Sequence, residues 1–439
     1  MQPDNDPLVS KIDDFGGIID AVENIGHSEN TTREMAEQCL KKIAHLEPTI
    51  GAWAHVDPEQ VREQVGALSQ QARNRALFSI PVAVKDVFDT ADMPTSYGSP
   101  IYSGYRPLDD AIAVQRLRAA GAIILGKTVT TEFAHSFPGK TRNPHGSNNT
   151  PGGSSSGSAA AVSAGFAVAA LGTQTSGSVI RPASFCGVVG FKPTYGRIPT
   201  TGVKALAKSL DTIGVLARTV ENAGAVARVL WNDVSAAQQV ISAEKPHRVG
   251  ICRTQYWDER QTGVAEAIEA ATESLRRSGV TVDEVELPRA CQGLNAAQEK
   301  IYAYEASIEF ADHVIRNPDK VSSDLKELIA AGHQVTEIQY RSALDTGMKA
   351  RAAFADFMQS FDCLLTPSAP GEAPDGLRWT GNPVFNRLWT LLYVPCLSLP
   401  TARGPKGLPI GIQLIGASMD DDALLSCGRW ISQHLHLPG

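Results

Sequence analysis

One lysine of this chain lies where a general base could form. Lys85 interrupts the apolar, β-branched run from Ile80 to Phe88, and lysine is rarely buried without a reason. Burial lowers the pKa of a lysine from its reference of roughly 10.4, by several units in extreme cases, so that the amine can act as a base near neutral pH. A buried ion pair with Asp86 or another acid would explain the same residue, and the sequence leaves both interpretations open.

A glycine- and serine-rich segment, Gly152–Gly157, supplies candidate hydroxyl groups. Its composition alone is typical of a flexible linker. It runs directly into Ser158–Gly165, however, which predicts a buried helix inside a domain. The segment therefore favours a tight backbone arch that presents hydroxyl and N–H groups at a helix N-terminus.

A second arch, Gly172–Pro182, contains Ser178 among other small residues. Small residues allow backbone N–H groups to converge on one point, as an oxyanion hole requires, although a polar surface turn has the same composition. A serine nucleophile also needs a base. None of the ten histidines stands in a Gly-x-Ser-x-Gly-like context, so Lys85 is the better candidate.

Several ordered segments together resemble the amidase signature family. The resemblance covers roughly Thr31 to the C-terminus and is weakest around 235–360. The segments that carry it are Ile80–Asp86, Gly126–Thr128, Thr131–Ala134, Pro151–Val162, Gly172–Pro182, Gly190–Arg197, Ser209–Gly214 and Gly407–Gln413.

The resemblance implies a Ser–Ser–Lys catalytic set. Ser178 falls on the family's nucleophile, Lys85 on its catalytic lysine, and Ser154 on the bridging serine that the family holds in a cis peptide bond. Ser154 and Ser178 lie 24 residues apart, as in the family pattern. The oxyanion hole falls on the backbone N–H groups of Thr175, Ser176, Gly177 and Ser178.

Two positions depart from the usual family pattern. Many members have glycine where this chain has Ser176, and many place arginine two residues after the nucleophile, whereas Arg181 stands three after it. The arginine spacing resembles small bacterial amidases of the malonamidase group, in which this residue can meet a substrate carboxylate. A structural ion pair, for example with Asp211, is the alternative for Arg181.

The alternation of predicted helices and strands indicates α/β architecture. We expect one large domain, with a central mixed, mostly parallel β-sheet covered by helices. The predicted parts of this amidase domain (1–439) are an N-terminal extension (1–30), a catalytic core (about 75–230 and 360–439) and a more variable, largely helical region (235–358). We expect the pocket to be built from residues 92–105, 135–137, 200–210 and 379–389.

Composition narrows the partners. The formal net charge is −7, which argues against nucleic acid because phosphate binding needs a basic surface. We expect no nucleic-acid partner, no membrane partner, no metal and no cofactor, and the family suggests a homodimer. Seven scattered cysteines and no visible signal peptide favour a cytoplasmic protein.

The main functional expectation is an amidase that hydrolyses carbon–nitrogen bonds of small linear, non-peptide amides through an acyl-enzyme on Ser178. Anilides, carbamates (urethanes) and esters share this acyl chemistry and are included as substrates. The alternatives are the catalytic subunit of a tRNA-dependent amidotransferase, a carbamate (urethane) hydrolase, and a catalytically inactive binding protein.

Overall fold

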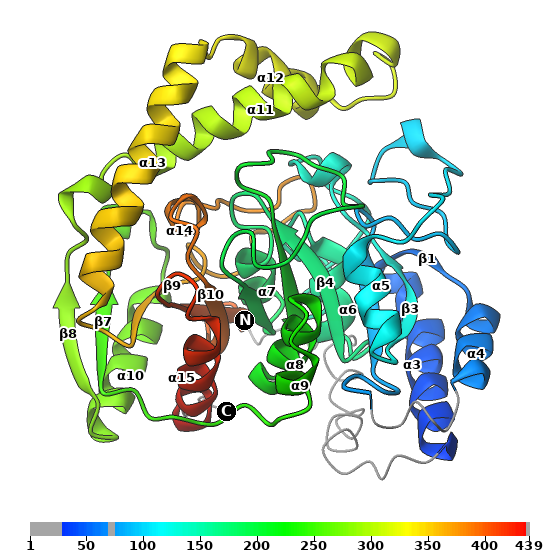
Figure 1. Cartoon of the computed structure of the whole chain (residues 1–439), viewed down its shortest axis with the longest axis horizontal. Helices are drawn as coiled ribbons and strands as arrows, with labels where there is room; N and C mark the ends of the chain where they lie inside the picture. The colour runs from blue at the N-terminus through cyan, green and yellow to red at the C-terminus, as the bar shows by residue number, and fades with distance from the viewer. Residues whose placement is uncertain (1–28, 69–74, 436–439) are drawn as a thin grey trace.

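The computed structural model describes residues 29–68 and 75–435 (Figure 1). The strands are β1 (Trp53–Val56), β2 (Pro81–Lys85), β3 (Ile123–Thr128), β4 (Ala169–Gln174), β5 (Val189–Lys192), β6 (Thr212–Ala217), β7 (Arg248–Cys252), β8 (Thr281–Val285), β9 (Cys363–Pro367), β10 (Cys396–Arg403) and β11 (Pro409–Ile415). The α-helices are α3 (Glu29–Ile50), α4 (Pro58–Ala67), α5 (Ile112–Ala119), α6 (Ser156–Ser163), α7 (Ile180–Phe185), α8 (Val220–Leu230), α9 (Val234–Ala237), α10 (Val264–Arg277), α11 (Leu294–Arg316), α12 (Ser323–His333), α13 (Glu337–Met358), α14 (Arg387–Leu391) and α15 (Asp421–His434).

All strands of the described residues form one sheet. Its 11 strands follow the order β1-β3-β2-β4-β6-β5-β10-β11-β9-β7-β8. The expected single α/β domain with a mixed, helix-covered sheet is confirmed. The sheet is not mostly parallel, however, because only β2–β3, β2–β4, β7–β8 and β7–β9 pair in parallel, whereas six described pairings are antiparallel.

Strand β2 is buried on both faces, and its alternation separates two cores. Val82 and Val84 join the cluster that contains residues of α5, α8 and α15, whereas Ala83 joins the cluster that contains residues of α3, α4 and α6. Successive side chains of a strand point to opposite faces. Lys85, two residues after Ala83, therefore starts from the face that α6 covers.

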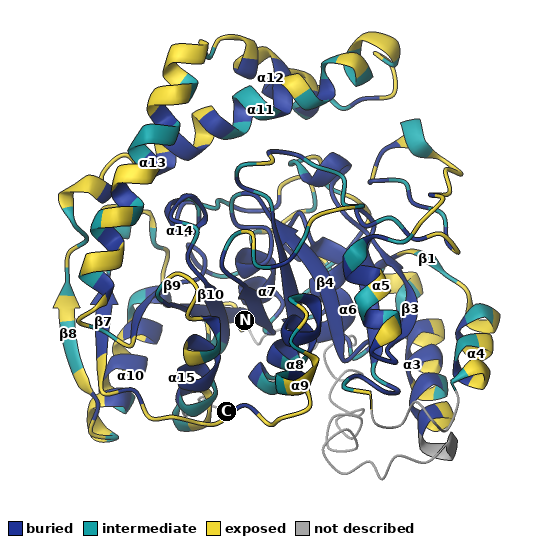
Figure 2. Cartoon of the chain, in the orientation of Figure 1, coloured by how far each residue is buried: buried dark blue, intermediate teal, exposed yellow. Residues whose placement is uncertain are grey.

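Helices α11, α12 and α13 (residues 294–358) form a helical arm above one edge of the sheet (Figure 1). The outer surfaces of α12 and α13 are exposed, whereas α6 and the central strands of the sheet are buried and the edge strand β8 is partly exposed (Figure 2). The arm lies between β8 and β9 in the chain. The arm can therefore contribute pocket residues that are distant in sequence from the rest of the site.

The expected N-terminal extension falls almost entirely on residues 1–28, outside the described part, and the proposed division into core and variable region stays a prediction. Within residues 29–68 and 75–435, no helix is both long and apolar enough to cross a bilayer. The cytoplasmic localisation also stays a prediction.

Candidate active site

Lys85 ends β2 and is fully buried. Because β2 and β4 are parallel neighbours, the ends of both strands meet at one edge of the sheet. Lys85 Nζ lies 2.7 Å from Ser154 Oγ and 2.7 Å from Thr173 Oγ1 near the end of β4. Hydrogen bonds of Lys85 thus connect the two predicted arches, Gly152–Gly157 and Gly172–Pro182.

The alternative of an ion pair between Lys85 and Asp86 is wrong. Asp86 Oδ1 lies 3.0 Å from Nζ of Lys127, another buried lysine, and Asp86 Oδ2 accepts hydrogen bonds from Ser96. Burial holds the pKa of the Lys85 amine well below its ordinary value, and the negative charge of Asp211 opposes this shift. A neutral amine is the protonation state that a base requires.

Ser154 lies immediately before α6 and is 1% exposed. The Gly153–Ser154 peptide bond is cis, as the family resemblance implies. The neighbouring Ser155 hydroxyl accepts a hydrogen bond from Thr173 N (3.3 Å) and so ties this arch to β4. The segment is an ordered arch and not a linker.

Ser178 lies in the loop between β4 and α7, and is 7% exposed at the wall of a cavity. In the described part of the chain, the Ser178 hydroxyl makes no hydrogen bond, and the backbone N–H groups of residues 175–178 have no hydrogen-bond acceptor. Gly177 is required here, because a Cβ atom would lie 2.4 Å from Asn386 Oδ1. Four free donors beside a free hydroxyl are the arrangement that an acyl-transfer site needs.

Arg181 is 4% exposed and lines the same cavity. Its Nε and Nη2 donate to backbone oxygens of Thr380 (2.8 Å) and Gly153 (2.7 Å), and Nη1 has no partner among the described residues. Burial, and then the charge of Arg387, lowers the pKa of Arg181 to about 9. Asp211 does not pair with it, because Asp211 instead accepts from the Thr175 hydroxyl (2.6 Å) and from backbone N–H groups of residues 206 and 207.

The cavity beside Ser178 has a volume of about 180 Å³. Three of the four segments expected to build it contribute, and residues 92–105 do not. Arg387 of α14 falls within the expected segment 379–389, whereas sequence reasoning missed Tyr302 of the arm. His135, whose pKa burial lowers to about 4, binds Tyr302 through its ring nitrogen and so connects the arm to the core.

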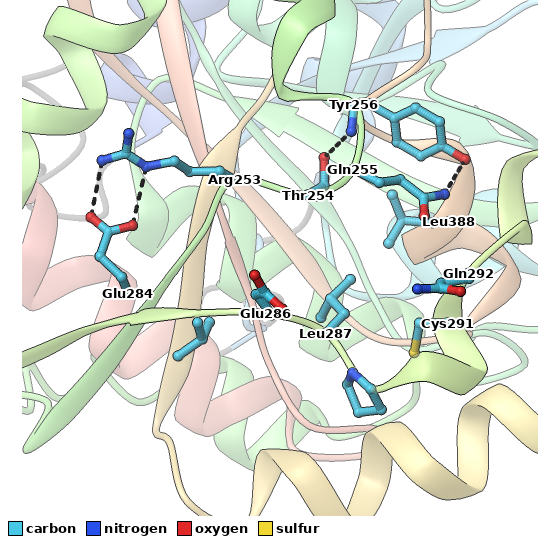
Figure 3. A pocket seen from close by; sticks show the side chains of 12 residues that line it. Arg253, Thr254, Gln255, Tyr256, Glu284, Glu286, Leu287, Cys291, Gln292 and Leu388 are labelled. Atoms are coloured by element: carbon cyan, nitrogen blue, oxygen red, sulfur yellow. Dashed lines mark hydrogen bonds and ion pairs between the residues drawn. The ribbon is translucent and has the colours of Figure 1, made fainter.

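A larger cavity of about 500 Å³ opens beyond the ends of β7 and β8 (Figure 3). Arg253 and Glu284 form an ion pair (3.0 Å) on one side of it, and Leu388 contributes from α14. None of the predicted catalytic residues lines it. The cavity beside Ser178 is therefore the candidate active site.

Comparison with known proteins defines the class. The sequence matches the family described as Amidase over residues 34–425, and the chain belongs to that family. It is therefore an amidase-family enzyme of the carbon–nitrogen hydrolase type. It also superposes on a crystal structure described as an amidase with a TM-score of 0.83, at 30% identity over 95% of this chain and 98% of the other.

Particular relatives carry a narrower description. A glutamyl-tRNA(Gln) amidotransferase subunit of Nitratidesulfovibrio vulgaris (strain DP4) is 35% identical, over 90% of this chain and 92% of the relative. The structure of the subunit of the same name from Thermotoga maritima superposes with a TM-score of 0.77, at 29% identity over 92% of each chain.

These relatives overturn two expectations from sequence. A small-amide hydrolase as the main function is contradicted, because relatives with 31–35% identity over most of the chain are named as amidotransferase subunits. The expectation of no nucleic-acid partner is contradicted for the same reason, because those proteins are named for a tRNA. Net charge misled the prediction, since it describes the whole chain and says nothing of a complex with other subunits. The narrower placement in the malonamidase group stays a prediction.

Proposed function

We propose that this chain is the amide-cleaving subunit of a tRNA-dependent amidotransferase. It releases ammonia from a linear primary amide, and on a partner subunit the ammonia attacks an ATP-activated side-chain carboxyl group of an amino acid carried by tRNA, so that the amide forms and phosphate leaves. The observation that carries the proposal is the 35% identity to the glutamyl-tRNA(Gln) amidotransferase subunit of Nitratidesulfovibrio vulgaris over 90% of this chain. The placement of Lys85 beside Ser154 supports it, because a subunit without catalysis has no need of that pair.

The reaction begins when Ser178 Oγ attacks the carbonyl carbon of the amide. Binding of the donor must bring the Ser178 hydroxyl within hydrogen-bond reach of Ser154; its proton then passes to Ser154, and the Ser154 hydroxyl proton passes to the neutral amine of Lys85. The N–H groups of residues 175–178 stabilise the oxyanion. The relay returns a proton to the leaving nitrogen as ammonia departs, and water then hydrolyses the acyl-enzyme with the relay as base.

Arg181 reads a carboxylate on the donor amide. Its Nη1 is buried, unpartnered in the described part of the chain, and lies in the wall of the cavity that Ser178 also lines. An unpaired buried guanidinium N–H is costly, and a carboxylate would satisfy it with a charge-assisted hydrogen bond. The arginine spacing shared with the malonamidase group agrees with this role.

The test measures two products with one preparation. Purified protein receives glutamine, asparagine or a dicarboxylic half-amide, and released ammonia is quantified, with Ser178→Ala as control. A second reaction adds the other subunits of a bacterial glutamyl-tRNA(Gln) amidotransferase, glutamyl-tRNA, ATP and Mg²⁺, and the amidated amino acid on the tRNA is measured by mass spectrometry. We expect ammonia in the first reaction and amidated tRNA in the second, each with the wild-type protein only. Ammonia release without any amidated tRNA would contradict the amidotransferase assignment.

A further inference from the structure

Two side chains from helices distant in sequence donate hydrogen bonds to backbone carbonyl groups of the nucleophile loop, which is the loop between β4 and α7 that contains Ser178. Gln298 Nε2 of α11 donates to Thr175 O (2.9 Å), and Thr390 Oγ1 of α14 donates to Ser176 O (2.8 Å). Gln298 and Thr390 are at most 1% exposed. These hydrogen bonds are therefore shielded from competing water.

Fixing a carbonyl also fixes the next N–H group. In a planar trans peptide unit, the C=O and N–H bonds point in opposite directions. The unit that contains Thr175 O also contains the Ser176 N–H, and the unit that contains Ser176 O also contains the Gly177 N–H. Both N–H groups lack an acceptor in the described part of the chain. Because Gln298 and Thr390 bind the two carbonyl groups from one side, the two free N–H groups point to the opposite side of the loop.

The same hydrogen-bond network also fixes the part of the loop that follows Ser178. Gln174 Nε2 donates to Thr390 Oγ1 (3.1 Å), and Gln174 Oε1 accepts from the N–H groups of Val179 (3.0 Å) and Ile180 (3.1 Å). The loop is thus fixed on both sides of Ser178. Hydrogen-bonded side-chain networks of this kind rigidify a buried site.

Ser176, the departure from the family's usual glycine, belongs to this network. Its hydroxyl lies 2.9 Å from Gln298 Nε2, so the amide of Gln298 bridges Thr175 O and Ser176 Oγ. A glycine would leave only one of these two acceptors. The extra side chain strengthens the hold on the loop and does not close the cavity.

We propose that Gln298 and Thr390 are positioning residues that aim the Ser176 and Gly177 N–H groups at the carbonyl oxygen of the donor, an inference that rests on the proposed role of Ser178. Neither residue touches the reacting atoms. They act through the carbonyl groups of the loop.

The first test is Thr390→Val, which preserves shape and removes the hydroxyl. The matched control is Thr366→Val, because Thr366 is fully buried in β9 and its hydroxyl makes no hydrogen bond within the described residues. Loss of an oxyanion-hole donor lowers kcat by roughly 10²–10³-fold. Misdirecting the donors without deleting them should cost about 10-fold to 100-fold in kcat, with KM for the amide unchanged, and Thr390→Ser should restore activity.

A second readout needs no amide donor. Phenylmethylsulfonyl fluoride modifies a serine nucleophile through a transition state that uses the same donors, and intact-mass spectrometry gives the rate of modification. Thr390→Val and Gln298→Met should slow the modification of Ser178 about as much as they lower kcat, and Thr366→Val should leave both rates unchanged. Gln298→Met serves alone if Thr390→Val does not fold.

Equal rates in Thr390→Val, Gln298→Met and Thr366→Val would overturn the inference. Loss of activity that Thr390→Ser fails to restore would also overturn it, because the hydroxyl would then not be the acting group. Wild-type protein that is modified by the sulfonyl fluoride but yields no amidated tRNA would contradict the proposed function alone.

Discussion

The proposed catalytic centre and the helical arm differ in how they are built. Lys85 ends β2, Ser178 follows β4 and Ser154 precedes α6, and all three are buried. The arm exposes large apolar side chains, including Ile315 (75%) and Ile338 (81%), yet it also supplies Tyr302 to the cavity. The chemistry is therefore specified by compact local motifs, whereas part of the cavity wall comes from a long helical insertion without a motif.

The largest expected effect is in the centre. Ser178→Ala removes the proposed nucleophile, and kcat should fall on the order of 10⁴-fold or more. Intact-mass spectrometry should detect an acyl-enzyme in the wild type and none in the variant. Full ammonia release by the variant would mean that another residue is the nucleophile.

Lys85→Met should separate activity from stability. Activity should fall about 10²–10⁴-fold with loss of the general base, and wild-type kcat/KM should rise with pH as Lys85 loses its proton. The folded pKa of Lys85 is depressed, whereas the unfolded pKa is roughly 10.4. Between these values the unfolded chain binds more protons, so wild-type stability falls as pH falls below roughly 10.4.

The variant lacks this linkage. Its melting temperature should exceed that of the wild type at pH 7, and the difference should shrink as the pH approaches the unfolded pKa of lysine. Calorimetry at several pH values checks this. A variant that melts lower than the wild type at every pH would argue against a neutral buried amine.

Arg181→Gln tests whether Arg181, in the wall of the cavity, binds a carboxylate of the substrate. A donor with a carboxylate should lose about 10²-fold in kcat/KM, because a hydrogen bond to a charged group contributes roughly 1.5–3 kcal/mol. The methyl ester of the same donor is the control, since it lacks the charge. Equal losses for both donors would assign Arg181 a structural role only.

Glu132 connects the segment that follows β3 to the arm. The buried carboxylate accepts hydrogen bonds from Ser99 Oγ (3.2 Å) and from Ser322 N (3.1 Å), the N-cap residue of α12. Glu132→Leu should weaken this attachment by about 1–3 kcal/mol. Hydrogen exchange of the α12 amides should accelerate while kcat changes little, and uniform exchange throughout the protein would instead indicate global destabilisation.

The smallest effect is expected on the outer face of the arm. Ile338→Glu changes an exposed side chain, and surface changes of this kind usually alter the free energy of unfolding by less than about 0.5 kcal/mol. Ammonia release should be unchanged. A clear loss of ammonia release in the isolated chain would show that this face of the arm takes part in catalysis.

Sequence reasoning reached the proposed centre in two steps: residue patterns singled out Lys85 and the two arches without deciding their roles, and the resemblance to the amidase signature family assigned those roles. Lys85 stood out as a charge in an apolar strand, and Ser154 and Ser178 stood in glycine-rich arches. Within residues 172–182, the role of Thr173 could have been inferred from its place near the end of a strand beside Lys85. The strand directions were harder, because antiparallel pairs such as β4–β6 depend on long connections that no local pattern encodes.

The positioning residues could not be predicted in this way. Gln298 and Tyr302 are four residues apart and so share one face of α11. Nothing in the helix sequence shows that this face meets a loop more than 100 residues earlier. Thr390 stands in an apolar stretch where a single hydroxyl carries no signal of its partner.

The outermost strand, β8, has a consequence for solubility. An unpaired strand edge is a template for another chain, and proteins blunt such edges with charged side chains. Asp283 and Glu284 of β8 form ion pairs with Arg248 (2.6 Å) and Arg253 (3.0 Å) of the strand-and-loop segment beside them. Replacing both acids with apolar residues would leave the edge of β8 open to pairing with another copy of the chain and would promote self-association. Ser154 and Ser178 lie far from this edge.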